Sequence, residues 1–289
     1  MPTLNLEHSM ATRREIFDVL CRAAAPLYGE AEARSIAEMI LLHRCGISRS
    51  ALIVEPAAEA FIEDLDLIVE ELMRWRPVQY ILGEASFDDM ELEVSEGVLI
   101  PRPETEDLVA WIAENCTAGA RIVDVCTGSG AIAIALARRI EGSTVVGIDL
   151  SPEALAIARR NAERYATGIE IIEGDALSEF SVGAIVEADV VVSNPPYIPE
   201  SDRVAMRRNV TDFEPSMALF VPDSDPLCFY RAIARRAQVL LRSGGYLYFE
   251  IYETLAAEMC ELLTLEGYTE ITLREDFRGK PRMICARKS

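Results

Sequence analysis

The sequence has little of what metal centres, secreted proteins and membrane spans require. It contains two histidines, His8 and His43, and its seven cysteines are scattered without a Cys-x-x-Cys pair. This pattern offers neither metal-ligand spacing nor a disulfide framework, and it favours reduced thiols in the cytoplasm. No apolar run approaches the ~20 residues that cross a bilayer. The first ten residues are polar and mixed in charge, unlike a signal peptide. We therefore expect a cytoplasmic protein with no metal and no membrane segment.

Positive charge is also scarce. The 289 residues include 28 Lys and Arg against 48 Asp and Glu, which gives a formal net charge of −20. A protein that holds nucleic acid needs basic residues to offset the phosphates, so this balance favours a protein or a small molecule as substrate. Half of the residues are apolar, and the length suits one large domain with a smaller companion.

The first part of the chain is predicted to be helical. Apolar residues recur at three- and four-residue spacing between residues 12 and 76, so we expect residues 1–75 to form a small helical bundle. Residues 76–103 follow as a linker. Within it, 90–94 alternates apolar and polar side chains, 95–97 is a turn and 98–100 is a second short apolar run. These segments predict a β-hairpin.

Strands and helices alternate in the last part, residues 104–289. Runs rich in Val and Ile predict strands at 121–125, 144–148, 169–172, 189–192, 246–251, 269–273 and 283–286. Helical patterns lie at 131–139, 152–165, 227–241 and 254–265. Repeated β-α-β units predict an α/β fold with a mostly parallel seven-stranded sheet, helices on both faces and an antiparallel C-terminal edge.

A Gly-rich loop follows the first of these strands. The run Asp124-Val125-Cys126-Thr127-Gly128-Ser129-Gly130 joins strand to helix, at the edge where doubly wound sheets bind ligands. Asp149 ends the next strand, where it can accept hydrogen bonds from ribose hydroxyls. Asp175 follows the third strand and is placed to meet an adenine edge. The three positions together predict a nucleoside site.

A dinucleotide site is the rival interpretation of this loop. Gly128-x-Gly130-x-x-Ala133 with an acid about 20 residues further on fits the dinucleotide fingerprint, which by itself is a weak signal. Asp124 argues against it, because an acid at the strand end repels a pyrophosphate and attracts the ammonium of methionine. A third acid, Asp175, also suits a nucleoside without phosphate. S-adenosylmethionine is therefore the predicted cofactor.

The tetrapeptide Asn194-Pro195-Pro196-Tyr197 directly follows a strand. Two prolines cannot extend a central strand, so the chain must turn at the carboxyl edge of the sheet. The side-chain oxygen of Asn194 and the carbonyl of Pro195 can both accept hydrogen bonds from an NH₂ group, and Tyr197 can stack on a planar group. Positioning of this kind predicts methylation of a planar nitrogen. The tetrapeptide alone leaves adenine and glutamine equally open.

Over nearly its whole length the sequence resembles the HemK/PrmC glutamine methyltransferases. The segments that carry the resemblance are Arg76-Pro77-Val78-Gln79-Tyr80-Ile81-Leu82-Gly83, Ile100-Pro101-Arg102-Pro103-Glu104-Thr105-Glu106, the Gly-rich loop, the tetrapeptide with Ile198, Phe213-Glu214-Pro215, and Asp276-x-x-Gly279-x-x-Arg282. The Pro-Arg-Pro-Glu-Thr-Glu run is the most specific of them. The sequence departs from the family at Tyr252, where glycine is usual, and at Pro281, where an acid is common.

The resemblance implies a Rossmann-like class I methyltransferase domain after the helical bundle and the hairpin linker. It implies transfer of methyl from S-adenosylmethionine, with S-adenosylhomocysteine as product, to the glutamine of the Gly-Gly-Gln motif of peptide chain release factors, which act in translation termination. It places the loop from Cys126 to Gly130, Asp149, Ala176 and Asn194 at the cofactor. Asn194 to Tyr197 would hold the glutamine, and Phe87, Arg102 and Thr105 would help to close the pocket.

Two other functions stay open at this point. An N6-adenine DNA methyltransferase shares the tetrapeptide, but the charge of −20 and the Pro-Arg-Pro-Glu-Thr-Glu run disfavour it. A catalytically silent S-adenosylmethionine-binding protein is disfavoured by the complete tetrapeptide. For the leading function, we expect the N-terminal helical domain to recognise the folded release factor, with no direct contact to nucleic acid.

Overall fold

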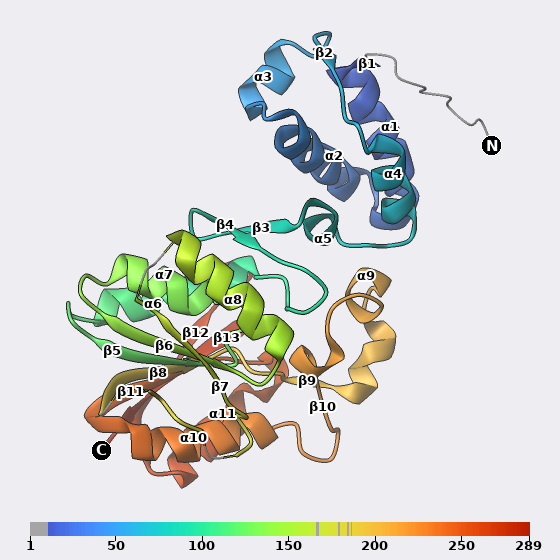
Figure 1. The fold of residues 1–289 in the computed structure, drawn as a ribbon. Coiled ribbons are helices and arrows are strands. Elements are labelled where there is room, and N and C mark those ends of the chain that lie inside the picture. Colours follow the sequence, from blue (N-terminus) through green and yellow to red (C-terminus); the bar gives the residue numbers. More distant parts are fainter. Residues whose placement is uncertain (1–10, 166–167, 179, 184, 186) are drawn as a thin grey trace. The chain divides into compact units, whose positions relative to one another are not determined.

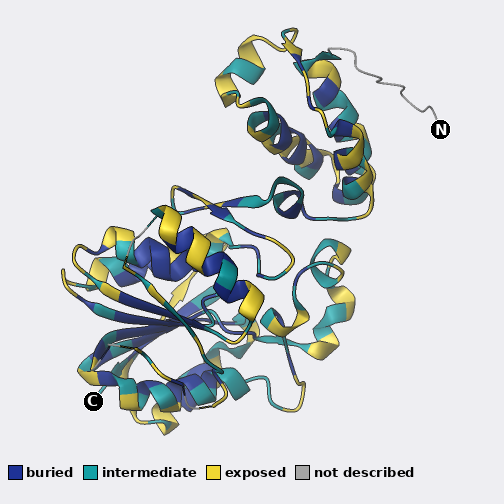
Figure 2. Ribbon diagram, in the orientation of Figure 1, coloured by how far each residue is buried: buried dark blue, intermediate teal, exposed yellow. Residues whose placement is uncertain are grey.

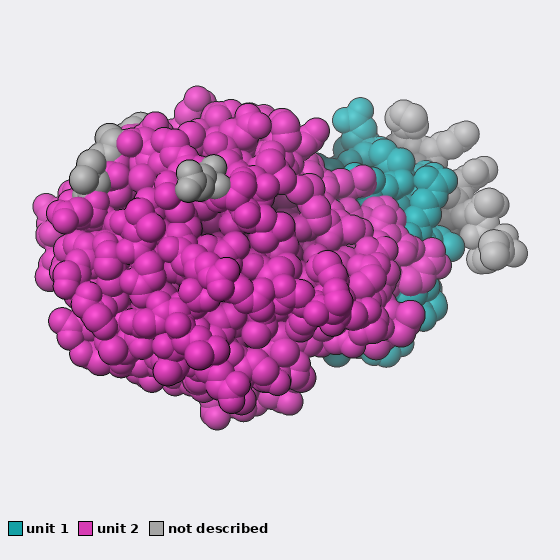
Figure 3. Space-filling view, turned by 90° about the horizontal axis from the view of Figure 1, so that it is seen from below, with its two compact units in different colours: residues 1–83 teal, residues 84–289 magenta. Residues whose placement is uncertain are grey.

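The computed structural model describes residues 11–165, 168–178, 180–183, 185 and 187–289. Two compact units divide the chain after Gly83 (Figure 3). The division falls inside the segment 76–103 that the sequence assigns to a linker, and the three-part organisation of the chain stays a prediction. None of the helices in the described ranges is both long enough and apolar enough to cross a membrane.

The first unit is the predicted helical bundle. Its helices are α1 (Arg13–Tyr28), α2 (Glu30–Cys45), α3 (Arg49–Val54), α4 (Leu65–Met73) and α5 (Val78–Leu82), and the short strands β1 (Ala11–Thr12) and β2 (Glu59–Ala60) pair antiparallel. Thr12 caps α1 through a capping box with Glu15, which satisfies two backbone amides at the helix start. Leu20, Ile40 and Leu72, from α1, α2 and α4, are fully buried in its core.

The second unit contains the predicted seven-stranded sheet (Figure 1). Its strands are β5 (Arg121–Val125), β6 (Thr144–Asp149), β7 (Glu170–Glu173), β8 (Ala188–Ser193), β11 (Leu241–Glu250), β12 (Tyr268–Glu275) and β13 (Pro281–Lys288). They lie in the order β12-β13-β11-β8-β5-β6-β7. All neighbouring pairs are parallel except those of β13, which runs antiparallel to β11 and β12. The mostly parallel sheet and its antiparallel edge are confirmed.

Helices cover both faces of this sheet (Figures 1 and 2). One face carries α6 (Pro103–Asn115), α7 (Ala131–Arg139) and α8 (Pro152–Tyr165), and the other carries α10 (Cys228–Leu240) and α11 (Ala256–Leu265). The side chains of β8 alternate between the two layers: Val190 and Val192 join the first, and Val191 joins the second. Strands buried on both faces explain the continuous apolar runs that the sequence shows.

The segment 76–103 contains a β-hairpin, but not the one predicted around residues 95–97. β3 (Glu84–Phe87) pairs antiparallel with β4 (Met90–Glu93), whereas residues 98–100 form no strand. The turn consists of Asp88 and Asp89, both with positive φ (49° and 57°). Such two-residue turns match the twist of a hairpin, and aspartate tolerates the left-handed conformation. The prediction of a hairpin turn at 95–97 was wrong because the glycine there is a plainer turn signal in the sequence than the Asp-Asp pair.

The hairpin is fixed to α8 by two side chains. Asn161 accepts a hydrogen bond from the backbone N–H of Glu93 at 2.8 Å and donates to its carbonyl at 3.0 Å. The Tyr165 hydroxyl makes the same pair of contacts with Glu91. Since a strand with free backbone groups invites further pairing, these contacts stabilise the exposed side of β4.

A connecting segment after β8 completes the unit. It contains β9 (Ile198–Pro199), the 3₁₀ helices η1 (Glu200–Ala205) and η2 (Ser216–Ala218), the short helix α9 (Arg208–Thr211) and β10 (Phe220–Val221), which pairs parallel with β9. A further 3₁₀ helix, η3 (Glu253–Leu255), leads into α11. The segment returns the chain to the carboxyl edge of the sheet, where it borders the cavity described next.

Candidate active site

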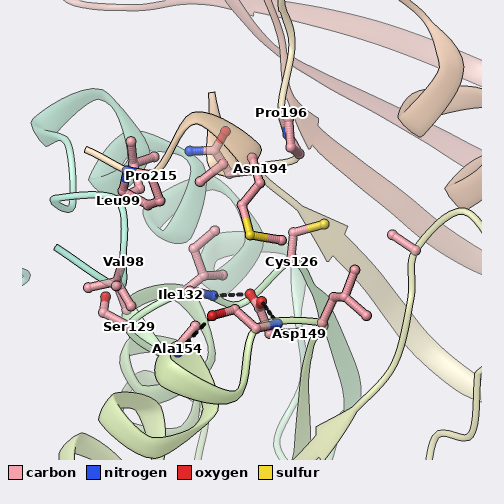
Figure 4. A pocket seen from close by; sticks show the side chains of 18 of the residues that line it. Val98, Leu99, Cys126, Ser129, Ile132, Asp149, Ala154, Asn194, Pro196 and Pro215 are labelled. Atoms are coloured by element: carbon pink, nitrogen blue, oxygen red, sulfur yellow. Dashed lines mark hydrogen bonds between the residues drawn. The ribbon is translucent and has the colours of Figure 1, made fainter. Parts of the chain in front are cut away.

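The carboxyl ends of the central strands lie side by side. Val125, the last residue of β5, is in register with Ile148 of β6 and with Ser193 of β8. A cavity of about 430 Å³ opens at this edge, within the ~300–1,000 Å³ range of small-molecule sites. Figure 4 shows Asp149 on one side of the cavity and Asn194 and Pro196 on the other. Segment 97–105 and residues 215–220 supply further walls.

The Gly-rich loop approaches the cavity with its backbone. Cys126, Gly128 and Gly130 all have positive φ (61°, 55° and 83°), and the first two of these residues line the cavity together with Ser129. A Cβ on Gly130 would meet Ile134 of α7 at 3.1 Å and Ala158 of α8 at 3.4 Å. Glycine there lets the two helices pack closely. Thr127 and Gly130 are not among the lining residues.

Asp149 is held by backbone amides. Its Oδ2 accepts from the N–H of Gly128 at 2.8 Å and its Oδ1 from the N–H of Ser151 at 3.0 Å. Burial raises the pKa of Asp149, and the amides of Ser151 and Gly128 oppose the rise. The carboxylate lines the cavity with acceptor capacity left over, as a contact to vicinal hydroxyls requires. Asp175 and Ala176, which follow β7, also line the cavity.

Asp124 lies under the loop and not in the cavity wall. It is fully buried, and its Oδ2 accepts from the Thr127 hydroxyl at 2.6 Å. Among the described residues, no donor reaches its Oδ1 with full hydrogen-bond geometry. Burial raises the pKa of Asp124 to about 7, against the opposing effects of the Thr127 hydroxyl and the backbone of Ala133. A buried acceptor without a partner is costly, and a cationic group bound at the loop would offset that cost.

The start of the tetrapeptide is fixed to the neighbouring strands. The buried Ser193 hydroxyl donates to the carbonyl of Val125 at 2.6 Å, which ties the end of β8 to β5. Asn194 and Pro196 line the cavity. The Asn194 side-chain NH₂ faces the Thr105 hydroxyl at 3.4 Å, and that hydroxyl donates to Glu250 Oε2 at 2.5 Å. Asn194 thus enters the cavity wall from the centre of the sheet edge.

Tyr197 and Pro195 are not among the lining residues. The Tyr197 hydroxyl donates to Glu250 Oε1 at 3.0 Å, and its ring stacks on that of Tyr252, with centroids 5.9 Å apart. The Tyr252 hydroxyl donates to Asp202 at 2.7 Å. Tyr252, the departure from the family pattern, therefore supports the tetrapeptide from outside the cavity. The predicted stacking of Tyr197 on a substrate stays a prediction.

Two segments that the sequence analysis quoted separately meet at Glu214. This buried carboxylate accepts from the backbone N–H of Ile100 at 3.1 Å and pairs with Arg102 at 2.5 Å. Arg102 lines the cavity together with Thr105 and with Phe87 of β3. The pairing draws segment 100–105 against residues 213–215, so the walls from both segments are fixed to each other.

Glu250, Glu214 and Asn161 support the site, and none of the three was predicted from the sequence to have a role. Asn161 also donates to the carbonyl of Ser129 at 2.9 Å and so joins α8 to the Gly-rich loop. Glu214 lies in the Phe213-Glu214-Pro215 segment that already matched the family pattern, which was the available signal. Among the described residues, no group of three or more His, Cys, Asp or Glu side chains could hold a metal ion. All seven cysteines, each in the described ranges, are free.

Comparison with known proteins gives two family matches. The description "PrmC N-terminal domain" matches residues 18–83, and "Methyltransferase domain" matches residues 122–213. Among curated relatives, release factor glutamine methyltransferase of Bacteroides thetaiotaomicron is 41% identical over 225 residues, which is 78% of this chain and 81% of that protein. The enzyme of the same name from Flavobacterium psychrophilum is 38% identical, over 91% of this chain and 94% of that protein. The one from Bacillus subtilis is 34% identical, over 94% of this chain and 98% of that protein.

Solved structures share the fold at low sequence identity. A 16S rRNA N2 G1207 methyltransferase of T. thermophilus, in complex with AdoMet and guanosine, aligns with a TM-score of 0.52 and 17% identity, over 71% of this chain and 50% of that one. A methyltransferase from Pyrococcus furiosus aligns with a TM-score of 0.50 and 16% identity, over 69% and 89%. These similarities confirm a class I methyltransferase fold for the second unit.

Proposed function

The chain belongs to the release factor glutamine methyltransferases, and we propose that it transfers a methyl group from S-adenosylmethionine to the side-chain amide nitrogen of a release factor glutamine. S-adenosylhomocysteine is the second product. The glutamine is that of the Gly-Gly-Gln motif. The observation that carries the assignment of this site is the position of Asn194, a planar amide in the wall of the cavity, opposite Asp149, an acid that suits a nucleoside.

The cofactor half of the cavity suits S-adenosylmethionine. Asp149, held by two backbone amides, would accept hydrogen bonds from the ribose hydroxyls. Asp175 and Ala176 line the cavity and would border the adenine. Asp124 lies behind the Gly-rich loop, bonded to Thr127, and its acidic side chain would favour an ammonium group bound at that loop. When bound, the cofactor supplies an electrophilic methyl group on a sulfonium.

The other half holds the nucleophile. An amide nitrogen is unreactive because its lone pair is delocalised into the carbonyl. The Asn194 oxygen would accept a hydrogen bond from the substrate NH₂ group, which fixes the nitrogen and favours its pyramidal form as the new C–N bond forms. As that bond forms, the bond between the methyl carbon and the sulfonium sulfur would break, and the proton that the nitrogen then loses would pass to bulk solvent outside the cavity. Apolar walls, among them Phe87, Val98 and Leu99, exclude water and strengthen this hydrogen bond.

The helical unit would recognise the partner protein, and the protein would act in the cytoplasm. Helix α3 carries two exposed apolar side chains, Ile53 (72% exposed) and Val54 (76%), and Phe61 nearby in the sequence is also exposed. Exposed apolar groups of this kind are typical of protein contact surfaces. The net charge of −20 favours a protein partner over direct contact with nucleic acid.

A single methylation assay tests the function. The full chain is incubated with methyl-labelled S-adenosylmethionine and a purified release factor, and the Gly-Gly-Gln peptide is then analysed by mass spectrometry. We expect one added methyl group on the glutamine, and none on a factor in which that glutamine is alanine. Label on adenine of duplex DNA with none on the factor would support the DNA methyltransferase instead. Cofactor binding without any transfer would support a silent binding protein.

A second assay tests the role of the helical unit. The double variant Ile53→Ser/Val54→Ser should raise KM for the whole factor while leaving KM for a short Gly-Gly-Gln peptide unchanged. Exposed Val239→Ser on α10 of the other unit is the matched control and should change neither. Equal effects of the α3 substitutions on both substrates would contradict this recognition role.

A further inference from the structure

A buried acid lies directly behind the candidate methyl-transfer site. Glu250 ends β11, the strand next to β8 in the sheet, and only 1% of its surface is exposed. Its two carboxylate oxygens accept from two hydroxyls, those of Thr105 at 2.5 Å and Tyr197 at 3.0 Å. Burial raises the pKa of Glu250, and Thr105, Tyr197 and the positive charge of Arg282 oppose the rise. None of the steps of methyl transfer described above uses this acid directly.

The contact with Glu250 determines where the Thr105 hydroxyl points. A hydroxyl has one proton to donate, and a carboxylate can only accept, so the proton of Thr105 lies toward Glu250. The Thr105 oxygen then offers only lone pairs to its other neighbour, the Asn194 side chain at 3.4 Å. If the Asn194 amide were reversed, two oxygens would face each other with no proton between them.

We propose that Glu250, acting through Thr105, sets the orientation of the Asn194 amide, so that its NH₂ faces the protein and its Oδ1 faces the cavity. Glu250 is then a positioning residue for the transfer. This inference rests on the proposed function, because a glutamine amide needs an acceptor. With the Asn194 amide reversed, its NH₂ would face the NH₂ of the substrate glutamine in the cavity, and the target nitrogen would not be held.

Glu250 is itself held in place from several sides. The Tyr230 hydroxyl donates to its backbone carbonyl at 3.1 Å, and the N–H of Ile251 donates to the carbonyl of Arg282 at 2.8 Å. The Arg282 side chain pairs with the buried Asp276 at 3.3 Å. The Pro-Arg-Pro-Glu-Thr-Glu run and the C-terminal Asp276-x-x-Gly279-x-x-Arg282 pattern thus support the same carboxylate, one through Thr105 and the other through Arg282.

Three variants of the full chain test the proposal. Thr105→Val removes the hydroxyl and keeps the shape of the side chain, Thr105→Ser keeps the hydroxyl, and Glu250→Gln keeps the shape but replaces one acceptor by a donor. For each we would measure kcat and KM with the release factor, the Kd of S-adenosylhomocysteine and the Tm. We expect Thr105→Val and Glu250→Gln to lower kcat by about 10- to 100-fold. KM and Kd should stay within about threefold, and Thr105→Ser should stay close to wild type.

The double variant separates a relay from two independent effects. If Thr105 and Glu250 act as one unit, Thr105→Val/Glu250→Gln should lower kcat no further than either single change. Wild-type kcat in Thr105→Val, or additive losses in the double variant, would overturn the proposal. Weaker cofactor binding and a lower Tm in parallel with the lower kcat would also overturn it, because a merely structural role gives that result. If wild-type enzyme does not methylate the factor, the proposed function fails instead.

A measurement without turnover tests the orientation itself. The chain has only five asparagines, so selective ¹⁵N-asparagine labelling gives few side-chain NH₂ signals, and Asn194→Asp identifies the Asn194 pair by its disappearance. In wild type we expect one slowly exchanging hydrogen in that pair. In Thr105→Val, exchange should accelerate at least tenfold, and in Thr105→Ser it should not. Equal exchange in wild type and Thr105→Val would overturn the proposal, whatever the activity.

Discussion

The two halves of the cavity are built from different kinds of contact. On the cofactor side, backbone amides of Gly128 and Ser151 hold Asp149, over sequence separations of 21 and 2 residues. On the amide side, side chains hold side chains over long separations: 145 residues from Thr105 to Glu250 and 89 from Thr105 to Asn194. Contacts to backbone amides survive most substitutions of the residues that supply them. A series of side chains that hydrogen-bond to one another is broken when any one of them is replaced. The amide side should therefore be the more sensitive half.

Asn194→Ala should produce the largest effect. It removes the acceptor for the substrate amide, and loss of one such preorganised hydrogen bond lowers kcat by about 10²–10³-fold. Affinity for S-adenosylhomocysteine, measured by calorimetry, should change less than tenfold. Asn115→Ala at the end of α6, outside the cavity lining, is the control. Equal losses of kcat and cofactor affinity would remove the distinction between the halves.

Asp149→Ala should weaken cofactor binding and leave kcat nearly unchanged. It removes a carboxylate that bonds two loop amides and lines the cavity, and hydrogen bonds to charged groups contribute about 1.5–3 kcal/mol. We expect the Kd of S-adenosylhomocysteine to rise by about 10- to 100-fold, with kcat at saturating cofactor within a few-fold of wild type. Glu173→Ala, an exposed acid in register with Asp149 at the end of β7, should leave both unchanged.

Asp124 should make stability depend on pH. Its pKa of about 7 in the folded protein exceeds the ordinary value of 3.8, so between these values the folded chain keeps a proton that the unfolded chain has lost. The free energy of unfolding should then fall by about 1.4 kcal/mol from pH 5 to pH 6 through this group. Asp124→Asn cannot ionise and should lack this contribution. The same dependence of the unfolding free energy on pH in wild type and Asp124→Asn, measured by denaturation between pH 5 and 8, would contradict this prediction.

Cys126 should give the smallest effect. Its φ of 61° is a left-handed conformation that glycine adopts without strain. Burial raises the pKa of its thiol well above the usual value, so the thiol stays protonated. Cys126→Gly and Cys126→Ala both remove the sulfur, but only the alanine keeps a Cβ in this conformation. We expect the glycine variant to be the more stable of the two by about 1 kcal/mol or less in urea denaturation. An alanine variant of equal or greater stability would show that the loop carries no such strain.

Much of the fold followed from local patterns. Strands buried on both faces, the Gly-rich loop and the Asn-Pro-Pro-Tyr turn each depend on residues close together in the chain, and the sheet and its edge were predicted correctly. The hairpin partner was wrong because the turn depends on the backbone dihedrals of Asp88 and Asp89, which a composition typical of strands does not reveal. Glycine and proline mark turns in a sequence more clearly than an Asp-Asp pair does.

The sequence by itself determined the family, the order of strands and helices, and the acids and tetrapeptide that follow the strands. Only the tertiary structure decided which of these residues meet. It placed Asp149 and Asn194 in one cavity, put Asp124 and Tyr197 behind its walls, and brought Glu250 and Glu214 to the segment 100–105. The physical reason is the length of the connections. Hydrogen bonds that close over more than a hundred residues form only after the sheet has aligned its strand ends, and no local pattern encodes that alignment.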